Sequence, residues 1–556
     1  MSTAFRALLE LCKRRGFLFQ SAEIHGGLRG AYDYGPLGTE LKKNLAAVWW
    51  NTNVYQREDV VGIDTSIITP PSVLKASGHV DQFTDALVDS LLTKERFRPD
   101  KAPELTLIKK EGEMLIPIQA PDKAVAKEWE KKIREQIVPG AKISRKGREI
   151  LLHAEAMREG QLILQGEGKT NHIQVPYNGY AEPDTNSPFL THPRAFNLMF
   201  KTFLDPIDPL DRAIQAVQAT PHGNVREAVD ASLASSTVYL RPETAQGIFI
   251  NLPHLLRTTR LRPPCGVAQL GKSFRNEIRL EHAIFRTPEF EQMELEYFVP
   301  PSEADGWFTY WKEQRMQWWR TLARNPDGFR ARPHDRSELA HYAKACVDVE
   351  YSFPWGWGEV EGVANRGDYD LVQHAQATGT SFECGGDNGE NKFLPHVIES
   401  SCGLNRAMLA FMLDAYDEVV EEANSSSAKH SSRPVLRLHP LLAPIKAAVM
   451  PLISRPELIA LAQRIAVNTR RRMRERIELD AAGGNKVGKR YYRHDEIGTP
   501  WCITVDFQSL EDGSVTIRDR DTTQQVRVHM EEVVPWLRDK MEVYALGFEV
   551  DESEKQ

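Results

Sequence analysis

The stretch AQLGKSFRNEIRLEHAIFRTPEFEQMELEYF, residues 268–298, decides the fold of this chain. Its pattern predicts two antiparallel strands joined by a charged loop. In the first strand, alternation separates Gln269, Gly271, Ser273, Arg275 and Glu277 from Ala268, Leu270, Phe274 and Ile278. In the second strand, it separates an apolar face of Met293, Leu295, Tyr297 and Val299 from Phe290, Gln292, Glu294 and Glu296. One face of the hairpin is therefore predicted to be core, and the other to carry chemistry.

The polar face of this hairpin suits a nucleotide together with an amino acid. A guanidinium such as that of Arg275 binds phosphate, a ring such as that of Phe290 stacks on a flat base, and carboxylates bind an ammonium group. ATP and an amino acid together require this set of groups. The alternative is a solvated hairpin with cross-strand ion pairs, which is common in antiparallel sheets.

Composition indicates an ordinary soluble chain. Its 556 residues, 41% hydrophobic and 26% charged, are enough for about two to four domains. Residues 1–20 predict a short amphipathic helix and lack the continuous apolar core of a signal peptide. No stretch has enough apolar residues to span a bilayer. We therefore expect a cytoplasmic protein with no membrane partner.

Cysteine spacing and charge bear on two further classes of site. The six cysteines lie far apart and form no CxxC pair, so neither a disulfide framework nor a zinc site is predicted. The net charge of −7 argues against a generally basic nucleic-acid-binding surface, although it does not exclude local basic patches.

Candidate site residues also lie outside the hairpin. In YLRPETAQG, residues 239–247, Arg241 and Glu243 share one face of an extended stretch, and TAQG starts a helix; a simple surface ion pair is the alternative. Gly403 precedes an apolar helix whose first turn holds Arg406, where a lone Arg is usually solvated or capping. Helical spacing predicts core residues at Leu41, Leu45, Val48, Trp49, Trp307, Phe308, Trp311, Trp318 and Trp319.

Two segments suggest separate domains. Residues 98–185 alternate strand-like and helix-like runs with many charges, as an inserted α+β module does. A Ser-rich linker, residues 423–434, precedes alternating strands and helices that predict a small α/β domain over residues 435–556. Between Arg464 and Arg493, ten Lys or Arg residues stand against three acidic ones. Such a run is usually a solvated helix face, but the predicted loop 483–498 adds two tyrosines, which suits single-stranded RNA.

These motifs resemble those of one enzyme family. FRNE (274–277) with FRTPEFEQMELEYF (285–298) resembles motif 2 of the class II aminoacyl-tRNA synthetases, in detail the homodimeric glycyl-tRNA synthetases. Residues 394–418 resemble motif 3, and residues 488–507 resemble the anticodon-binding domain shared by several class IIa members. The resemblance implies an α+β fold, with an antiparallel sheet flanked by helices as a catalytic domain over 1–97 and 186–422. It also implies a homodimer formed through motif 1, in the N-terminal part.

The resemblance implies how ATP is bound. Arg275 bridges the α-phosphate and the incoming carboxylate, Arg286 and Arg406 hold the β- and γ-phosphates, Phe290 stacks on adenine and Glu277 meets its amino group. Catalysis is implied for Arg275, Glu277 and Arg406. Other ATP contacts are implied at Asn276, Phe285, Glu359, Val360 and Gly403. Mg²⁺ is implied on the phosphates and Glu359, because this ion takes oxygen ligands.

The resemblance also implies the amino-acid and tRNA contacts. The ammonium of glycine is assigned to Glu243, Glu294, Glu399 and Ser401, with Phe290, Gln292 and Arg98 also around the substrate. Anticodon contacts are implied at Lys489, Arg490, Tyr491 and Arg493. Where the family usually has proline, this chain has Ser400, which loosens the backbone but removes no functional group. The cysteine-rich piece that many members carry near the insertion is absent here, and the insertion fits a surface module as well as a clamp for the tRNA acceptor stem.

The implied activity is that of a glycine–tRNA ligase, in which glycine is first joined to AMP and then transferred to the 3′ end of tRNA(Gly). The glycine carboxylate is already an anion, so positioning and electrostatics carry the first step. A pocket without room for a β-carbon refuses larger amino acids, so no editing domain is expected. The alternatives are a catalytically inactive, nucleic-acid-binding accessory protein and a class IIa synthetase for threonine, proline or histidine.

Overall fold

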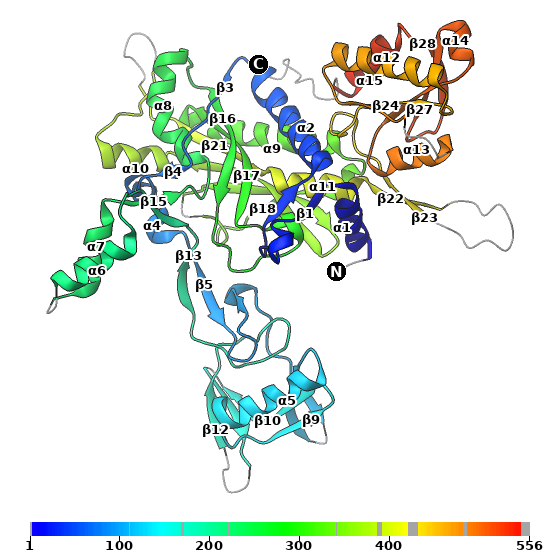
Figure 1. Ribbon diagram of the computed structural model, residues 1–556. Helices are drawn as coiled ribbons and strands as arrows, with labels where there is room; N and C mark the ends of the chain where they lie inside the picture. Colours follow the sequence, from blue (N-terminus) through cyan, green and yellow to red (C-terminus); the bar gives the residue numbers. More distant parts are fainter. Residues whose placement is uncertain are drawn as a thin grey trace. The chain divides into compact units, whose positions relative to one another are not determined.

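The computed structural model describes residues 3–545, except 111, 159, 168–171, 221–222, 341, 386–391, 421–431 and 482–485 (Figure 1). The chain divides into two compact units. The first unit contains Met1–Ser77, Lys201–Phe274 and Glu281–Gln556, and the second contains Gly78–Phe200 and Arg275–Leu280. The predicted inserted module, residues 98–185, lies within the second unit.

A seven-stranded sheet organises the first unit. Its strand order is β18 (Phe329–Pro333), β19 (Ala345–Phe353), β20 (Gly356–Gly367), β21 (His396–Gly403), β17 (Glu289–Val299), β16 (Cys265–Phe274) and β3 (Val60–Gly62) (Figure 1). Neighbours are antiparallel except β3 and β16. The predicted hairpin is confirmed as β16 and β17, with Gln269 opposite Glu294.

The first strand of the hairpin is shorter than its sequence pattern predicts. It ends at Phe274, so the expectation that Arg275, Glu277 and Ile278 continue it is wrong. The amide of Asn276 donates to the carbonyl of Leu198 at 2.7 Å, and the amide of Glu277 donates to the carbonyl of Arg275 at 2.8 Å. Because these bonds use the amides that a ladder would need, the chain turns out of the sheet here.

One face of the sheet packs against helices and forms the main core. Met293, Leu295, Tyr297 and Val299 are buried there, as predicted. The covering helices are α1 (Thr3–Arg15), α2 (Pro36–Trp50), α9 (Ala304–Leu322) and α11 (Leu404–Ala415). Trp49, Trp311, Trp318 and Trp319 are buried in this layer, which confirms the prediction that they are core. Each large apolar side chain contributes about 1.5–3 kcal/mol by burial, so this face is a rigid support for the other.

The opposite face carries the polar side of the hairpin and is also covered. Helices α8 (Ala245–Thr259) and α10 (Tyr369–Thr378) contribute to a smaller apolar cluster on it. Gln292, Glu294 and Glu296 are 5%, 1% and 0% exposed. The alternative of a solvated hairpin is therefore wrong, because these carboxyl groups are removed from water.

The remaining elements of the first unit are short or peripheral. They include β1 (Leu18–Gln20) with β2 (Tyr32–Tyr34), β4 (Ile68–Thr69), β14 (Lys201–Phe203) and β15 (Thr237–Leu240), and the helices α3 (Pro71–Ala76), α6 (Pro209–Ala219) and α7 (Val225–Ala234). Residues 423–431 of the predicted linker lie outside the described residues. Its last three residues, 432–434, belong to β23 (Ser432–Leu436), which pairs with β22 (Tyr416–Val420).

The second unit is an α+β body, as the charge-rich alternation of residues 98–185 predicts. Its main sheet consists of β7 (Ile108–Lys110), β8 (Glu113–Gln119), β9 (Ile143–Lys146), β10 (Glu149–Arg158), β11 (Gln161–Gln165) and β12 (His172–Pro176). Helix α5 (Lys123–Lys132) packs on it through Trp129 and Ala126. A smaller sheet contains β5 (Thr84–Asp89), β6 (Arg96–Phe97) and β13 (Arg194–Asn197), and α4 (His79–Gln82) precedes it.

The predicted α/β domain after the linker is confirmed. Its sheet has the order β25 (Ile477–Leu479), β24 (Ala447–Pro451), β26 (Trp501–Val505), β27 (Ser514–Asp519) and β28 (Gln525–His529). Its helices are α12 (Pro456–Met473), α13 (Val487–Glu496), α14 (Gln508–Asp512) and α15 (Val533–Ala545). The predicted loop 483–498 is wrong from Val487 on, since α13 occupies most of it. No helix of the described chain is both long and apolar enough to cross a membrane.

Candidate active site

The polar face of the central sheet gathers acidic side chains in register. On β17, Glu294 lies opposite Gln269 of β16 and Ser401 of β21, and Glu296 lies opposite Glu399 of β21. The hydroxyl of Ser401 donates to Oε1 of Glu294 at 2.7 Å, and the amide of Gln292 donates to the same oxygen at 2.8 Å. The hydroxyl of Thr244 donates to the other carboxyl oxygen of Glu294. Of the predicted ammonium-binding residues, Glu294, Glu399 and Ser401 lie on β17 and β21, and Glu243 lies just before α8.

One buried guanidinium holds part of this cluster. Arg366, on β20, donates to Glu399 at 2.8 Å and to both carboxyl oxygens of Asp370 at 2.8 and 3.0 Å. It also lies 3.9 Å from Glu243 and stacks over the ring of Tyr342. The sequence analysis missed Arg366. Its signal was available in ANRGDYD, residues 364–370, where the arginine and Asp370 stand four residues apart.

A chain of polar side chains links this arginine network to α8 and α10. The amide of Gln246 donates to Glu243 at 3.2 Å and to Asp370 at 2.9 Å. Its carbonyl oxygen lies 2.9 Å from Nε2 of His374. Because each of these groups constrains its neighbour, the carboxylates of Glu243 and Asp370 are held in defined orientations.

The acidic cluster carries more carboxyl groups than the guanidinium of Arg366 can neutralise. Burial, and then the charges of Glu243 and Glu399, raise the pKa of Glu294 to about 7. Burial raises the pKa of Glu399 as well, against the opposing effect of Arg366. Burial raises the pKa of Glu296 well above its ordinary range. Like charges in a dry site repel one another and raise the pKa of each carboxyl group. A bound cation would relieve this repulsion, so the cluster attracts a cationic ligand.

Arg241 supports the cluster from the side. Its guanidinium donates to the backbone carbonyls of Lys272 at 2.7 Å and Thr65 at 2.8 Å. A β-carbon on Gly271 would lie 2.3 Å from Nη2 of Arg241, so a larger residue there would displace the guanidinium from its position against the strand. Arg241 and Glu243 are both buried, so the alternative of a surface ion pair is wrong.

A second group of predicted residues meets around Arg406, in the first turn of α11. Its Nε donates to the carbonyl of Phe285 at 2.9 Å, and its guanidinium lies over the Phe285 ring. Its Nη1 donates to the carbonyl of Glu359 at 3.1 Å and to its carboxylate at 3.3 Å. Gly403 is the N-cap of α11, and Val360 is buried in the main core, which leaves only its backbone available to a ligand.

Arg286 and Phe290 are further motif 2 residues of the first unit. Nη1 of Arg286 lies 3.4 Å from Glu281. Phe290 is half-buried on β17, opposite Ser273. It belongs to the face that carries Gln292 and Glu294, as alternation predicts.

Four predicted site residues belong to the second unit: Arg98, Arg275, Asn276 and Glu277. Arg98 donates to Asp85 at 2.8 Å and to Asp100 at 3.1 and 2.8 Å. The guanidinium of Arg275 lies 5.3 Å from the centre of the Phe83 ring. Within this unit, aspartates therefore hold Arg98 and an aromatic ring supports Arg275.

The core face of the same sheet contains a buried glutamate with a full set of donors. Glu361 on β20 accepts from Nε and Nη2 of Arg315 at 2.7 and 3.3 Å and from Trp319 at 2.6 Å. The hydroxyl of Ser400 donates to it at 2.6 Å. Ser400, at the position where the resemblance leads one to expect proline, thus gains a buried hydrogen bond that proline could not make.

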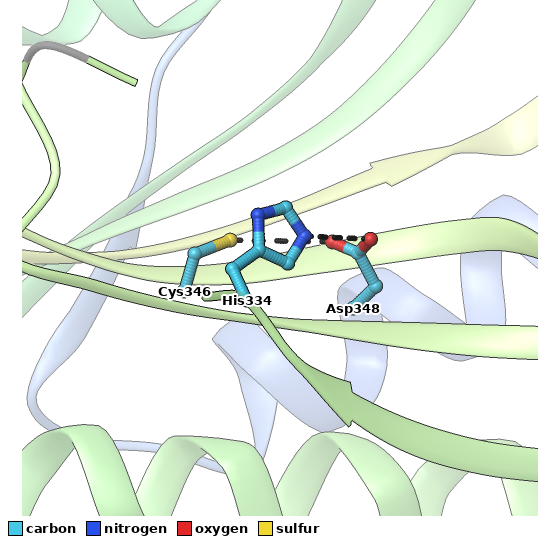
Figure 2. A group of neighbouring side chains, drawn as sticks. All are labelled: His334, Cys346 and Asp348. Carbon is cyan, nitrogen blue, oxygen red and sulfur yellow. Dashed lines mark hydrogen bonds and ion pairs between the residues drawn. The ribbon is translucent and has the colours of Figure 1, made fainter. Parts of the chain in front are cut away.

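A mixed group of donors lies at the β18–β19 edge of the sheet. Figure 2 shows His334, Cys346 and Asp348, whose ligand-type atoms lie within 4.8 Å of one another. Nε2 of His334 is 2.8 Å from Asp348. Nη2 of Arg332 donates to Asp348 at 3.1 Å and lies 3.3 Å from His334, while burial raises the pKa of Cys346 to about 12. A guanidinium thus already occupies the position that a cation would take, and the thiol is protonated, so we assign no metal to this group.

The predicted anticodon contacts lie on α13 and differ in accessibility. Arg490 is buried and donates to the carbonyls of Pro451, at 2.6 Å, and Asp480. Tyr491 is buried, with its hydroxyl 2.5 Å from that of Thr504. These two side chains support the fold of the domain, and the RNA contacts expected of them stay a prediction. Lys489 is exposed and Arg493, which pairs with Asp480, is half-buried.

Comparisons with known proteins agree with this architecture. Residues 446–540 match the family model described as "Anticodon binding domain". Over almost its whole length the chain resembles curated proteins named glycine–tRNA ligase. The relative from Corynebacterium efficiens is 40% identical over 541 residues, 96% of this chain and 97% of that protein.

Two further relatives carry the same name. The protein from Mycolicibacterium paratuberculosis is 41% identical over 544 residues, 97% of this chain and 98% of that protein. The protein from Treponema denticola is 38% identical over 538 residues, 97% of each. With a class II arrangement of strands, a buried acidic cluster and near-complete coverage at this identity, the chain belongs to the glycine–tRNA ligase family.

Proposed function

We propose that this protein activates glycine with ATP, releasing pyrophosphate, and transfers the glycyl group to the 3′ end of tRNA(Gly). The observation that carries the proposal is the buried acidic cluster around Glu294. It combines the carboxyl groups of Glu243, Glu294 and Glu399, of which Arg366 donates a hydrogen bond only to Glu399 and lies 3.9 Å from Glu243. Such a site attracts a small cation and repels an anionic ligand.

The ammonium of glycine is the cation that we assign to this cluster. Ser401 and Gln292 both hydrogen-bond Oε1 of Glu294, so the carboxylate is oriented before a ligand arrives. Carboxylates in a buried site bind an ammonium group more strongly than in water, because there is little competition from solvent. Positioning the ammonium also positions the carboxylate of glycine, which is the nucleophile of the first step.

ATP is proposed to bind through the Arg406 group and the other motif residues. Arg406 and the ring of Phe285 lie in contact, which suits a phosphate beside a flat base. We propose phosphate contacts for Arg286, adenine contacts for Phe290, Asn276 and Glu277, and a bridging role between carboxylate and α-phosphate for Arg275. Arg98 is proposed to assist glycine binding. These roles rest on the resemblance to the family motifs.

Mg²⁺ is proposed to accompany ATP, and the residues near Arg406 fit such an ion. Glu359 has a half-exposed carboxylate and lies on β20 opposite Glu350, whose own carboxylate is bound by Arg330 and Arg332. Oxygen ligands of this kind are those that Mg²⁺ prefers, and bound to ATP it would offset the charge of the departing pyrophosphate. Glu359 is the residue that we expect to hold it.

The cluster also offers an explanation for selectivity. Glycine differs from alanine only by the absence of a β-carbon, and a packed site can refuse that carbon by steric overlap. We therefore propose that no editing step is needed. The tRNA, a homodimeric state and a cytoplasmic location are proposed from the family motifs, with Lys489 and Arg493 as the accessible basic groups on α13.

Glycine-dependent ATP–pyrophosphate exchange tests this function directly. Purified protein is assayed with glycine, alanine and a panel of other amino acids, next to Arg275→Ala. The matched control is Arg279→Ala, on the same segment, whose side chain is 43% exposed and 3.4 Å from Asp184. We expect exchange with glycine alone, loss by at least ~100-fold in Arg275→Ala and retention in Arg279→Ala.

Either of two results would contradict the proposal. Exchange with alanine comparable to that with glycine would exclude the steric account of selectivity. No exchange with any amino acid, from folded protein, would favour the accessory nucleic-acid-binding protein instead.

A further inference from the structure

Glu296 is a buried carboxyl group to which the proposed reaction gives no role. Its side chain is 0% exposed, and its two carboxyl oxygens receive no hydrogen bond from any residue that the structure describes. Most buried polar groups in proteins are hydrogen-bonded, so an orphaned carboxyl requires an explanation. An ionised carboxylate without donors is strongly disfavoured in a dry site, whereas a neutral carboxylic acid is tolerated.

The neighbours of Glu296 make ionisation still less favourable. Glu399 lies directly opposite on β21, Val267 lies opposite on β16, and Glu294 is two residues along the same face. Other charged groups near it are Arg366 of β20 and Asp370 of α10. The donors of Arg366 are engaged by Asp370 and by Oε2 of Glu399. The facing pair Glu296–Glu399 thus resembles two carboxyl groups that share one proton, because like charges on directly opposed residues of neighbouring strands cannot both ionise easily.

We propose that Glu296 is a positioning residue that acts as a neutral carboxylic acid: it shares its proton with Glu399 and so fixes that carboxylate for the ammonium of glycine. The inference rests on the proposed function of the cluster. Arg366 binds one oxygen of Glu399, and the proton of Glu296 would bind the other. Glu399 is then held from both sides, while Glu294 supplies the ionised contact to the ligand.

The proposal makes opposite predictions for two substitutions of the same residue. Glu296→Gln keeps a neutral side chain that can still donate to Glu399, so the KM for glycine should change by no more than about threefold. Glu296→Leu keeps the volume but removes the donor, so the KM for glycine should rise by ~10-fold or more while the KM for ATP stays unchanged. A purely structural role would affect glycine and ATP alike.

Glu294→Gln is the matched control for an ionised contact. It should raise the KM for glycine by ~100-fold. If Glu296→Gln, folded by near-ultraviolet circular dichroism, lost glycine affinity as severely as Glu294→Gln, then Glu296 would be an anion that binds the ligand and the proposal would be wrong. If Glu296→Leu matched the wild type, the positioning role would be wrong.

Infrared spectroscopy of the wild-type protein tests the protonation state without activity or variants. At about pH 8, where ordinary carboxyl groups are ionised, we expect a carbonyl stretch of a protonated buried carboxyl group. Its absence would overturn the proposal even if both variants failed to fold. Failure of the proposed function would be distinct, because wild-type protein would then show no glycine-dependent exchange whatever the infrared result.

Discussion

Two buried glutamates on opposite faces of the same sheet differ in their partners. Glu361 and Glu296 are both 0% exposed. Glu361, on the core face, accepts hydrogen bonds from Arg315, Trp319 and Ser400. Glu296, on the other face, accepts none from the described residues. The sheet therefore keeps one charge fully paired in its framework and leaves an acidic surplus on the face that we assign to glycine.

The difference between Glu361 and Glu296 distinguishes a charge that is buried for stability from carboxyl groups that are buried for ligand binding. A paired buried ion contributes rigidity, and removing one partner leaves the other charge stranded. An under-paired acidic cluster instead destabilises the free protein and gains its missing partner when a cation binds. Each of the following predictions tests whether the two faces really differ in this way.

The largest expected effect concerns the paired face. Glu361→Gln leaves the guanidinium of Arg315 buried without its counter-ion, so the free energy of unfolding should fall by about 3–5 kcal/mol. Urea unfolding, monitored by circular dichroism, measures this free energy. Glu313→Gln, an exposed position on the same helix as Arg315, should change stability little. If Glu361→Gln lowered the free energy of unfolding no more than the Glu313→Gln control does, the pairing of Glu361 would not stabilise the fold.

The second effect is a pH dependence of stability from the acidic face. The pKa of Glu294 is raised to about 7 in the folded protein, above its unfolded value near 4.5, so the folded state binds more protons between these values. Its contribution to stability is therefore complete below about pH 4.5 and is lost as pH rises to 7, by up to about 3 kcal/mol. Unfolding of wild type and Glu294→Gln across this range should show a shallower decline in the variant. Parallel curves would contradict the assignment.

The third effect is on activity. Glu294→Gln should lower glycine-dependent exchange by ~100-fold at subsaturating glycine, mainly through KM, because a charged hydrogen bond to the ammonium is lost. Unlike Glu361→Gln, it should leave the protein at neutral pH as stable as wild type or more so. Loss of stability equal to that of Glu361→Gln would remove the distinction between the two faces.

The smallest effect compares neighbouring serines that point to opposite faces. Ser400→Ala removes the hydrogen bond to Glu361 and should cost about 1–2 kcal/mol of stability with no change in the KM for glycine. Ser401→Ala removes a donor to Glu294 and should raise that KM by ~10-fold with little change in stability. Thermal unfolding and ATP–pyrophosphate exchange assays on both variants test this comparison. If Ser400→Ala raised the KM for glycine and Ser401→Ala lowered the stability, the assignment of the two serines to opposite faces would be wrong.

Sequence alone predicted the parts of the fold that depend on local periodicity. Alternation identified the hairpin and its apolar face, and helical spacing identified the buried tryptophans of α9. It did not predict that the first strand stops at Phe274, because the amide of Asn276 bonds to the distant carbonyl of Leu198. Local sequence also did not predict that the polar face is buried, because the burial depends on α8 and α10, which come from other parts of the chain.

Sequence predicted the site residues that lie in recognisable motifs. It did not predict those whose roles depend on contacts between residues far apart in the sequence. Glu294, Glu399 and Ser401 were named from motifs, and pairing of β17 with β21 brings them together. Arg366 was missed because two of its three acidic partners, Glu243 and Glu399, lie far from it in the sequence. Helix α13 was mistaken for a loop because its basic residues and tyrosines suggested RNA, whereas two of them, Arg490 and Tyr491, face the core of the domain.

The most direct test of the central claim compares glycine with glycolate, which has the same carboxylate but a hydroxyl in place of the ammonium group. If the acidic face exists to bind a cation, ATP–pyrophosphate exchange should respond to glycine, and glycolate should support neither exchange nor competition with glycine at similar concentration. Exchange with glycolate comparable to that with glycine would show that the cluster around Glu294 does not recognise the ammonium group.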